Sequence, residues 1–154
     1  MSELIGSDSP LSSKAQATLR ALAGTIIPAS PEHNVPGVDD PVIFSDLLAS
    51  AGTMLDFLNE SVRALDDQSG SGGFSAQTPE RQLNLAEQFR VDQPEATGLI
   101  VSLLSLCYYR DDRVMASLDM APKPPFPDGF QIADGDWSLL DPVRARGTLY
   151  RQVP

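Results

Sequence analysis

His33 is the one histidine in the chain, and it follows Glu32 in a loop with several prolines. A two-histidine metal site, or a pair of histidines one helical turn apart, needs a second imidazole that this chain lacks. A hydrolase using His33 in a Ser-His-Asp triad is a further alternative, but no Gly-x-Ser-x-Gly elbow accompanies it. We therefore expect a solvated loop histidine without a catalytic role.

Three other patterns could carry chemistry. The glycine-rich segment 70–73 lacks both the spacing of a dinucleotide-binding loop and the Lys-Ser/Thr of a phosphate-binding loop. Paired acids such as Asp111 and Asp112 could act as acid and base, but capping a helix is their more ordinary role. Cys107 lies in an apolar run, which predicts a buried free thiol, and an intermolecular disulfide would require it to face outward. The sequence therefore predicts no catalytic, cofactor-binding or metal-binding residue.

The composition describes an acidic chain of single-domain size. Its 154 residues carry a formal net charge of -10, with 21 acidic against 11 basic residues. Such a chain is repelled by phosphate backbones and anionic lipid surfaces, so neither nucleic-acid binding nor membrane insertion is expected. The N-terminus shows no basic leader followed by an apolar segment, which predicts a cytoplasmic location as written.

Residues 99–109 form the most apolar stretch of the chain and are followed at once by Arg110. An element apolar at nearly every position is typical of a helix buried on most sides, and this one is too short to cross a bilayer. Further helices are predicted around it. They are expected from Lys14 to Ile27, from Pro41 after the Asp40 cap, from Thr53 to Asp67, from Pro79 after Thr78, and after Asp111 or Asp112.

Two details of these helices are specific enough to test. In the helix that follows Thr78, the spacing places Leu83, Ala86 and Phe89 inward, and Leu85 is less clearly assigned. Gly52 marks a break between two helical segments. The fold class is therefore all-α: an irregular bundle of about five or six helices with a long proline-rich C-terminal coil wrapped on its surface.

The predicted domain organisation is simple. Residues 1–11 are expected to be a disordered tail, and residues 12–154 a single helical domain that includes a proline-rich arm at 121–154. Segment 68–73 is the most flexible-looking linker, and weak strand signals occur near 129–132 and 148–150.

The C-terminal third combines aromatic residues, arginines and a stiff proline-rich backbone, which together are typical of protein interfaces. Two interpretations stay open: the arm packs against the helices of its own chain, or part of this surface binds a larger partner. The predicted partner interface consists of Tyr108, Tyr109, Arg110, Arg113, Phe126, Phe130, Trp137, Arg144 and Arg146.

Several motifs in this region resemble those of a known family. They are Tyr-Tyr-Arg-Asp-Asp-Arg-Val at 108–114, Pro-Pro-Phe-Pro-Asp-Gly at 124–129, Asp-Trp-Ser-Leu-Leu-Asp-Pro-Val-Arg at 136–144 with Tyr150 and Arg151, and the opening segment 19–28. Together they resemble the gluconate 2-dehydrogenase subunit 3-like family, the non-catalytic small subunits of flavin-dependent sugar and alcohol dehydrogenases.

The resemblance implies a hetero-oligomer. The expected partner is a large flavoprotein subunit of the glucose-methanol-choline oxidoreductase type, which holds the FAD and oxidises the substrate, while the small subunit supports its folding, stability or maturation. Some family members carry a twin-arginine signal, which this N-terminus lacks. A periplasmic complex would therefore need an export signal on the partner. The alternative is a stand-alone helical adaptor or chaperone without an oxidoreductase partner.

Overall fold

The computed structural model describes residues 11–122, 126–127, 129 and 134–147.

Side-chain caps set the starts of four helices. In each capped helix, an oxygen of the preceding residue accepts a hydrogen bond from a backbone N–H of the first turn. The caps and helices are Ser12 with α1 (Ser13–Ile26), Asp40 with α2 (Pro41–Ser50), Thr78 with α4 (Pro79–Asp92), and Asp111 with α6 (Asp112–Ser117). The predicted starts of these helices are confirmed.

The break predicted at Gly52 is also present. Gly52 has a positive φ of 45° and opens the short 3-10 turn η1 (Gly52–Met54), which leads into α3 (Leu55–Ser69). The chain bends by 90° between α2 and the segment Gly52–Ser69. Within the described residues no single helix is long and apolar enough to cross a membrane. This bent pair reaches that length and composition only when its two halves are counted together.

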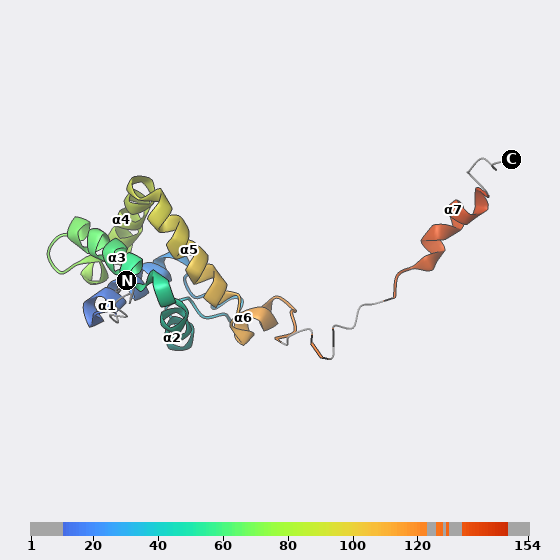
Figure 1. Cartoon of the computed structure of the whole chain (residues 1–154), viewed down its shortest axis with the longest axis horizontal. Helices are drawn as coiled ribbons and strands as arrows, with labels where there is room; N and C mark the ends of the chain where they lie inside the picture. The colour runs from blue at the N-terminus through green and yellow to red at the C-terminus, as the bar shows by residue number, and fades with distance from the viewer. Residues whose placement is uncertain (1–10, 123–125, 128, 130–133, 148–154) are drawn as a thin grey trace, which may run out of the picture. The chain divides into compact units, whose positions relative to one another are not determined.

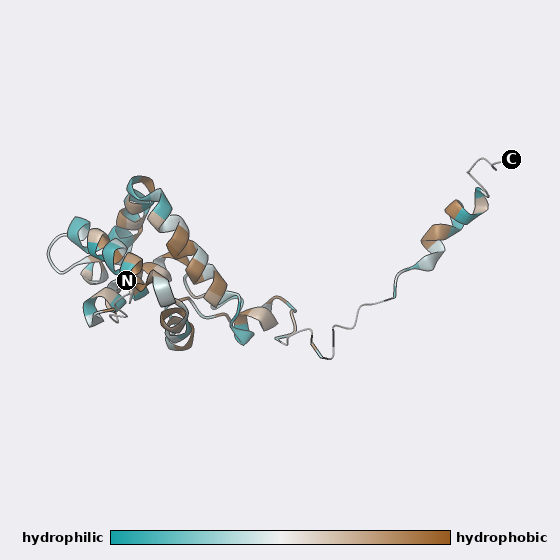
Figure 2. Cartoon of the chain, viewed as in Figure 1, coloured by the Kyte–Doolittle hydropathy of each residue, from teal (hydrophilic) through white to brown (hydrophobic). Residues whose placement is uncertain are grey.

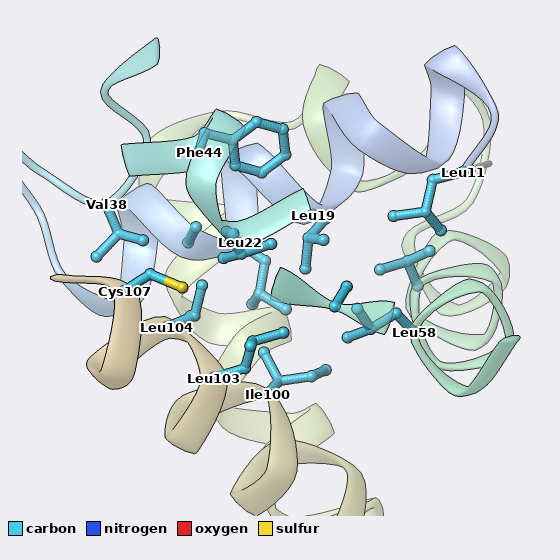
Figure 3. Packing of buried hydrophobic residues seen from close by; sticks show 14 of the residues in the cluster. Leu11, Leu19, Leu22, Val38, Phe44, Leu58, Ile100, Leu103, Leu104 and Cys107 are labelled. Atoms are coloured by element: carbon cyan, nitrogen blue, oxygen red, sulfur yellow. The ribbon is translucent and has the colours of Figure 1, made fainter. Parts of the chain in front are cut away.

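Six α-helices, α1 to α6, make up the described part of the first compact unit, Met1–Pro122 (Figure 1). Helix α1 packs against α3 and α4, while α2 packs against α5 (Pro94–Tyr108). Leu19, Leu58 and Leu104 are completely buried, and Figure 3 shows side chains from several helices meeting in one interior. Leu11, which the sequence assigned to the disordered tail, is only 4% exposed and belongs to this core. The all-α fold class is confirmed.

Helices α4 and α5 each correct one expectation about burial. In α4, Leu83 was predicted to point inward but is 60% exposed, while Leu85 and Phe89, one turn apart, are buried. In α5, Leu103 and Leu104 face the core, but Leu99 and Leu106 are 47% and 58% exposed. The prediction that this helix is buried on most sides is therefore wrong. Its apolar composition supplies both a buried face and an exposed apolar face.

The glycine-rich segment 70–73 is a tight turn fixed from within the bundle. Oδ1 of Asp66, a buried residue of α3, accepts hydrogen bonds from Thr18 Oγ1 at 2.7 Å and from the backbone N–H of Phe74 at 2.9 Å. Gly73 has a φ of 75°, and a Cβ there would lie 2.7 Å from the same Oδ1. Phe74 opens the short 3-10 turn η2 (Phe74–Ala76), and its side chain is completely buried.

Residues Lys123–Pro154 make up a second compact unit. Its described part contains a 3-10 turn, η3 (Trp137–Leu140), continued by the short helix α7 (Asp141–Ala145). Asp136 caps this segment, because its Oδ1 accepts a hydrogen bond from the Ser138 N–H at 3.0 Å. Apart from Gly129, the two strand signals fall outside the described residues. The single-domain organisation and the wrapped position of the arm stay predictions.

Candidate interaction surface

The two tyrosines at the end of α5 occupy different environments. Tyr108 is 8% exposed and belongs to the core, and its burial raises the pKa of its phenol. Tyr109 is 58% exposed, and its ring meets that of Tyr108 edge to face with centroids 5.3 Å apart. Of this pair, only Tyr109 therefore presents a large surface to a partner.

Arg110 ties the end of α5 to α2. Its Nε donates to Asp46 Oδ2 at 3.1 Å, and its Nη2 donates to the same oxygen and to Ser50 Oγ at 2.7 Å. The neighbouring carboxylate raises the pKa of the guanidinium above its already high ordinary value. The Arg110 side chain remains 49% exposed. Its main role in the structure is to join two helices, with the outer part of the side chain left at the surface.

Arg113 joins the capping residues of two helices. Its guanidinium donates to Asp40 at 2.8 and 3.2 Å and to Asp111 at 2.9 and 3.0 Å. Asp40 is the cap of α2 and Asp111 is the cap of α6. The Arg113 hydrogen bonds lower the pKa of both carboxyl groups, and the two carboxylates in turn raise the pKa of Arg113. These contacts fix the corner between α5 and α6 against the start of α2.

The exposed face of α5 adds two residues that the sequence interpretation missed. Leu99, Leu106 and Tyr109 are all exposed, and their spacing of seven and then three residues places them on one side of the helix. We call these three residues the α5 outer face. Figure 2 colours much of the α5 ribbon as hydrophobic. Helical spacing was the available signal, but an almost continuously apolar run hides which residues face outward.

The second unit exposes large apolar side chains in its short helical segment. Trp137 is 68% exposed and Leu139 is 74% exposed, and Leu140 and Val143 are also exposed. Arg144 Nη1 lies 3.5 Å from Asp141 Oδ1, and Arg146 is exposed. Phe126 is 83% exposed, whereas Phe130 lies outside the described residues. The described members of the predicted interface in this unit are therefore all at its surface.

The residues considered for chemistry belong to different elements: His33 to a loop, Cys107 to α5, and Asp111 to the cap of α6. His33 is exposed in a loop closed by a two-residue bridge between Ser30 and Val35. Cys107 is buried, and burial, followed by the nearby Asp46 carboxylate, raises the pKa of its thiol. Among the described residues, no group of three or more histidine, cysteine, aspartate or glutamate side chains is arranged to hold a metal ion.

Comparison with known proteins adds no relative. The chain matches no protein-family model, no curated protein and no solved structure.

Proposed function

We propose that this chain is a non-catalytic small subunit that binds the FAD-bearing catalytic subunit of a sugar or alcohol dehydrogenase. The exposed apolar segment Trp137–Val143 is the observation that carries the binding role. The identity of the partner rests on the resemblance of motifs 108–114, 124–129 and 136–144 to the gluconate 2-dehydrogenase subunit 3-like family. In this proposal the FAD and the reaction belong to the partner.

Physical chemistry favours a binding role for this segment. The helical stretch from Trp137 to Ala145 is far shorter than the roughly 12–15 residues at which an isolated helix becomes marginally stable in water. Such a segment gains stability when its apolar side chains are buried against another surface. Tryptophan and arginine are also the residue types that contribute most to binding energy at protein interfaces, and Trp137 and Arg144 supply both here.

The α5 outer face supports the same proposal from the first unit. Leu99, Leu106 and Tyr109 give an exposed apolar row on a helix whose opposite face is anchored in the core. Arg110 and Arg113 hold the end of this helix in place through their ion pairs with α2 and α6 residues. A rigid helix face that presents apolar side chains loses little entropy on docking, which favours binding.

Affinity purification of the tagged full chain from its native cells tests the proposal. The expected result is a co-purified protein with a flavin absorbance spectrum and sugar or alcohol dehydrogenase activity, while the chain purified alone is colourless and inactive. The double variant Trp137→Ala/Leu139→Ala should lose the flavin signal. Val42→Ala changes an equally exposed residue on α2 and should retain it.

Two results would contradict the proposal. One is flavin or dehydrogenase turnover in the isolated chain, which would place the chemistry in this subunit. The other is recovery of partners that carry no flavin, which would favour the stand-alone helical adaptor or chaperone.

A further inference from the structure

A cavity of about 210 Å³ lies where α1, α4 and α5 meet. Its walls are mostly apolar: α1 contributes Leu22 and Ile26, α4 contributes Phe89, and α5 contributes Ile100 and Val101. Leu22, Phe89 and Ile100 are core residues, so the cavity reaches into the interior of the first unit.

This cavity is open to solvent on one side, because the exposed residues Leu83, Glu87 and Arg90 form part of its wall. Apolar wall that faces water instead of a packed neighbour forgoes the free energy that burial of its surface would supply. An engineered apolar cavity of about 150 Å³ in another protein is large enough to bind benzene. The space between α1, α4 and α5 is therefore large enough for a molecule built on one six-membered ring.

The wall of this cavity also contains a hydroxyl group with no hydrogen-bond partner. Thr97 lines the cavity, and its Oγ1 is sealed from solvent and unpaired. It is the one buried side-chain nitrogen or oxygen in this condition among the residues that the structure describes. A buried hydroxyl without a partner is destabilising. Threonine in a helix uses two χ1 rotamers, so this hydroxyl can change its direction without moving the backbone.

The charged residues at the cavity neutralise each other. Arg90 donates to both carboxylate oxygens of Glu87, through its Nε at 3.0 Å and through its Nη2. Because each charge is satisfied by the other, this pair selects neither an anion nor a cation. The overall charge of -10 further disfavours an anionic ligand.

We propose that this cavity binds a small neutral molecule with a ring-sized apolar body and one hydroxyl group that hydrogen-bonds to Thr97. The apolar wall that faces solvent and the unpaired hydroxyl are two unfavourable features at one place, and a single ligand of this class relieves both. The inference does not depend on the proposed function, because it concerns a cavity that α1, α4 and α5 of the first unit line by themselves.

Methyl NMR spectra of the full chain, titrated with p-cresol and separately with toluene, test this assignment. The two probes share an aromatic ring and a methyl group and differ in the hydroxyl. We expect both to shift the methyl signals of Leu22, Ile26 and Val101. The ratio of the toluene to the p-cresol dissociation constant should fall about fivefold in Thr97→Val, because one hydrogen bond is lost. Thr97→Ser keeps the hydroxyl and should preserve the ratio.

Filling the cavity with a larger side chain provides a second, independent test. Ala86 lines the cavity, so Ala86→Leu should abolish the binding of both probes. Ala64→Leu makes the same change on α3 at a different surface depression and should leave binding intact. The assignment is overturned if neither probe shifts these methyl signals, if Thr97→Val leaves the ratio unchanged, or if Ala86→Leu binds both probes like the original chain.

Discussion

Arg113 Nη2 lies 2.8 Å from Oδ1 of Asp40, a residue 73 positions earlier in the sequence. The same guanidinium also binds Asp111, so one side chain connects the first turn of α2 with the first turn of α6. This contact joins the start of α2 to the corner between α5 and α6.

Removing this contact should destabilise the fold. Arg113→Ala leaves the Asp40 and Asp111 carboxylates without their shared cation, and we expect the free energy of unfolding to fall by about 1 kcal/mol, the upper end for partly exposed ion pairs. Urea denaturation measures this change. Arg90→Ala removes an exposed ion pair within one helix, and it should lower the free energy of unfolding by less than Arg113→Ala does. Equal losses in the two variants would show that linking distant helices adds no stability.

The same pair of carboxylates predicts a pH dependence. The folded-state pKa values of Asp40 and Asp111 lie below the ordinary 3.8. At pH values between the folded-state pKa and 3.8, the unfolded chain therefore binds more protons than the folded chain. The stabilisation is therefore present above pH 3.8 and is lost as the pH falls through the folded-state values. Urea denaturation at several pH values measures the free energy of unfolding of the original chain and of Arg113→Ala. The difference between these two free energies should become smaller below pH 3.8. If this difference stays constant below pH 3.8, protonation of Asp40 and Asp111 is not linked to the stability that Arg113 provides.

Substitution of Asp66 should destabilise the fold more than substitution of most other polar residues. Asp66→Ala leaves the buried Thr18 hydroxyl and the Phe74 N–H without their acceptor, and we expect a loss of about 3 kcal/mol in the free energy of unfolding. Thermal or urea denaturation measures it. Asp67→Ala removes the adjacent, exposed carboxylate and serves as the control. Similar stabilities for the two variants would contradict the role assigned to Asp66.

The α5 outer face should matter for binding and not for folding. Leu106→Glu replaces a side chain that is 58% exposed, so we expect the free energy of unfolding to change by no more than about 0.5 kcal/mol. Recovery of the flavoprotein in the purification experiment should nevertheless drop. Leu104→Ala, at a fully buried position, should instead cost about 3 kcal/mol. Full flavoprotein recovery with Leu106→Glu would remove this face from the proposed interface.

The thiol of Cys107 should be protected in the native state. Burial raises its pKa and limits access, so a thiol-reactive dye should label the native chain much more slowly than the chain in denaturant. Mass spectrometry over time measures the labelled fraction. Rapid labelling of the native chain would show that Cys107 is accessible, as an intermolecular disulfide requires.

Local chemistry made much of the fold predictable. Ser12, Asp40, Thr78 and Asp111 each act through contacts within three residues, which a sequence displays directly. Helix faces were harder to predict. Leu83 and Leu85 are both leucines, and which one faces the core depends on where α1 and α5 lie around α4.

The candidate surfaces were harder still to predict from the sequence than the helix faces, because they depend on contacts between distant residues. Arg110 and Arg113 were predicted from their residue types to contact a partner, yet their donors bind Asp46, Ser50 and Asp40, which are 60 or more positions away. No local pattern marks such pairs. The cavity at Thr97 likewise arises only where three helices meet, so it has no signature in the order of residues.

The close approach of Gly73 to Asp66 has an evolutionary consequence. A side chain at position 73 would collide with the carboxylate that binds Thr18 and Phe74, and the positive φ there disfavours any other residue. Homologous chains that keep an acid at position 66 should therefore also keep glycine at position 73.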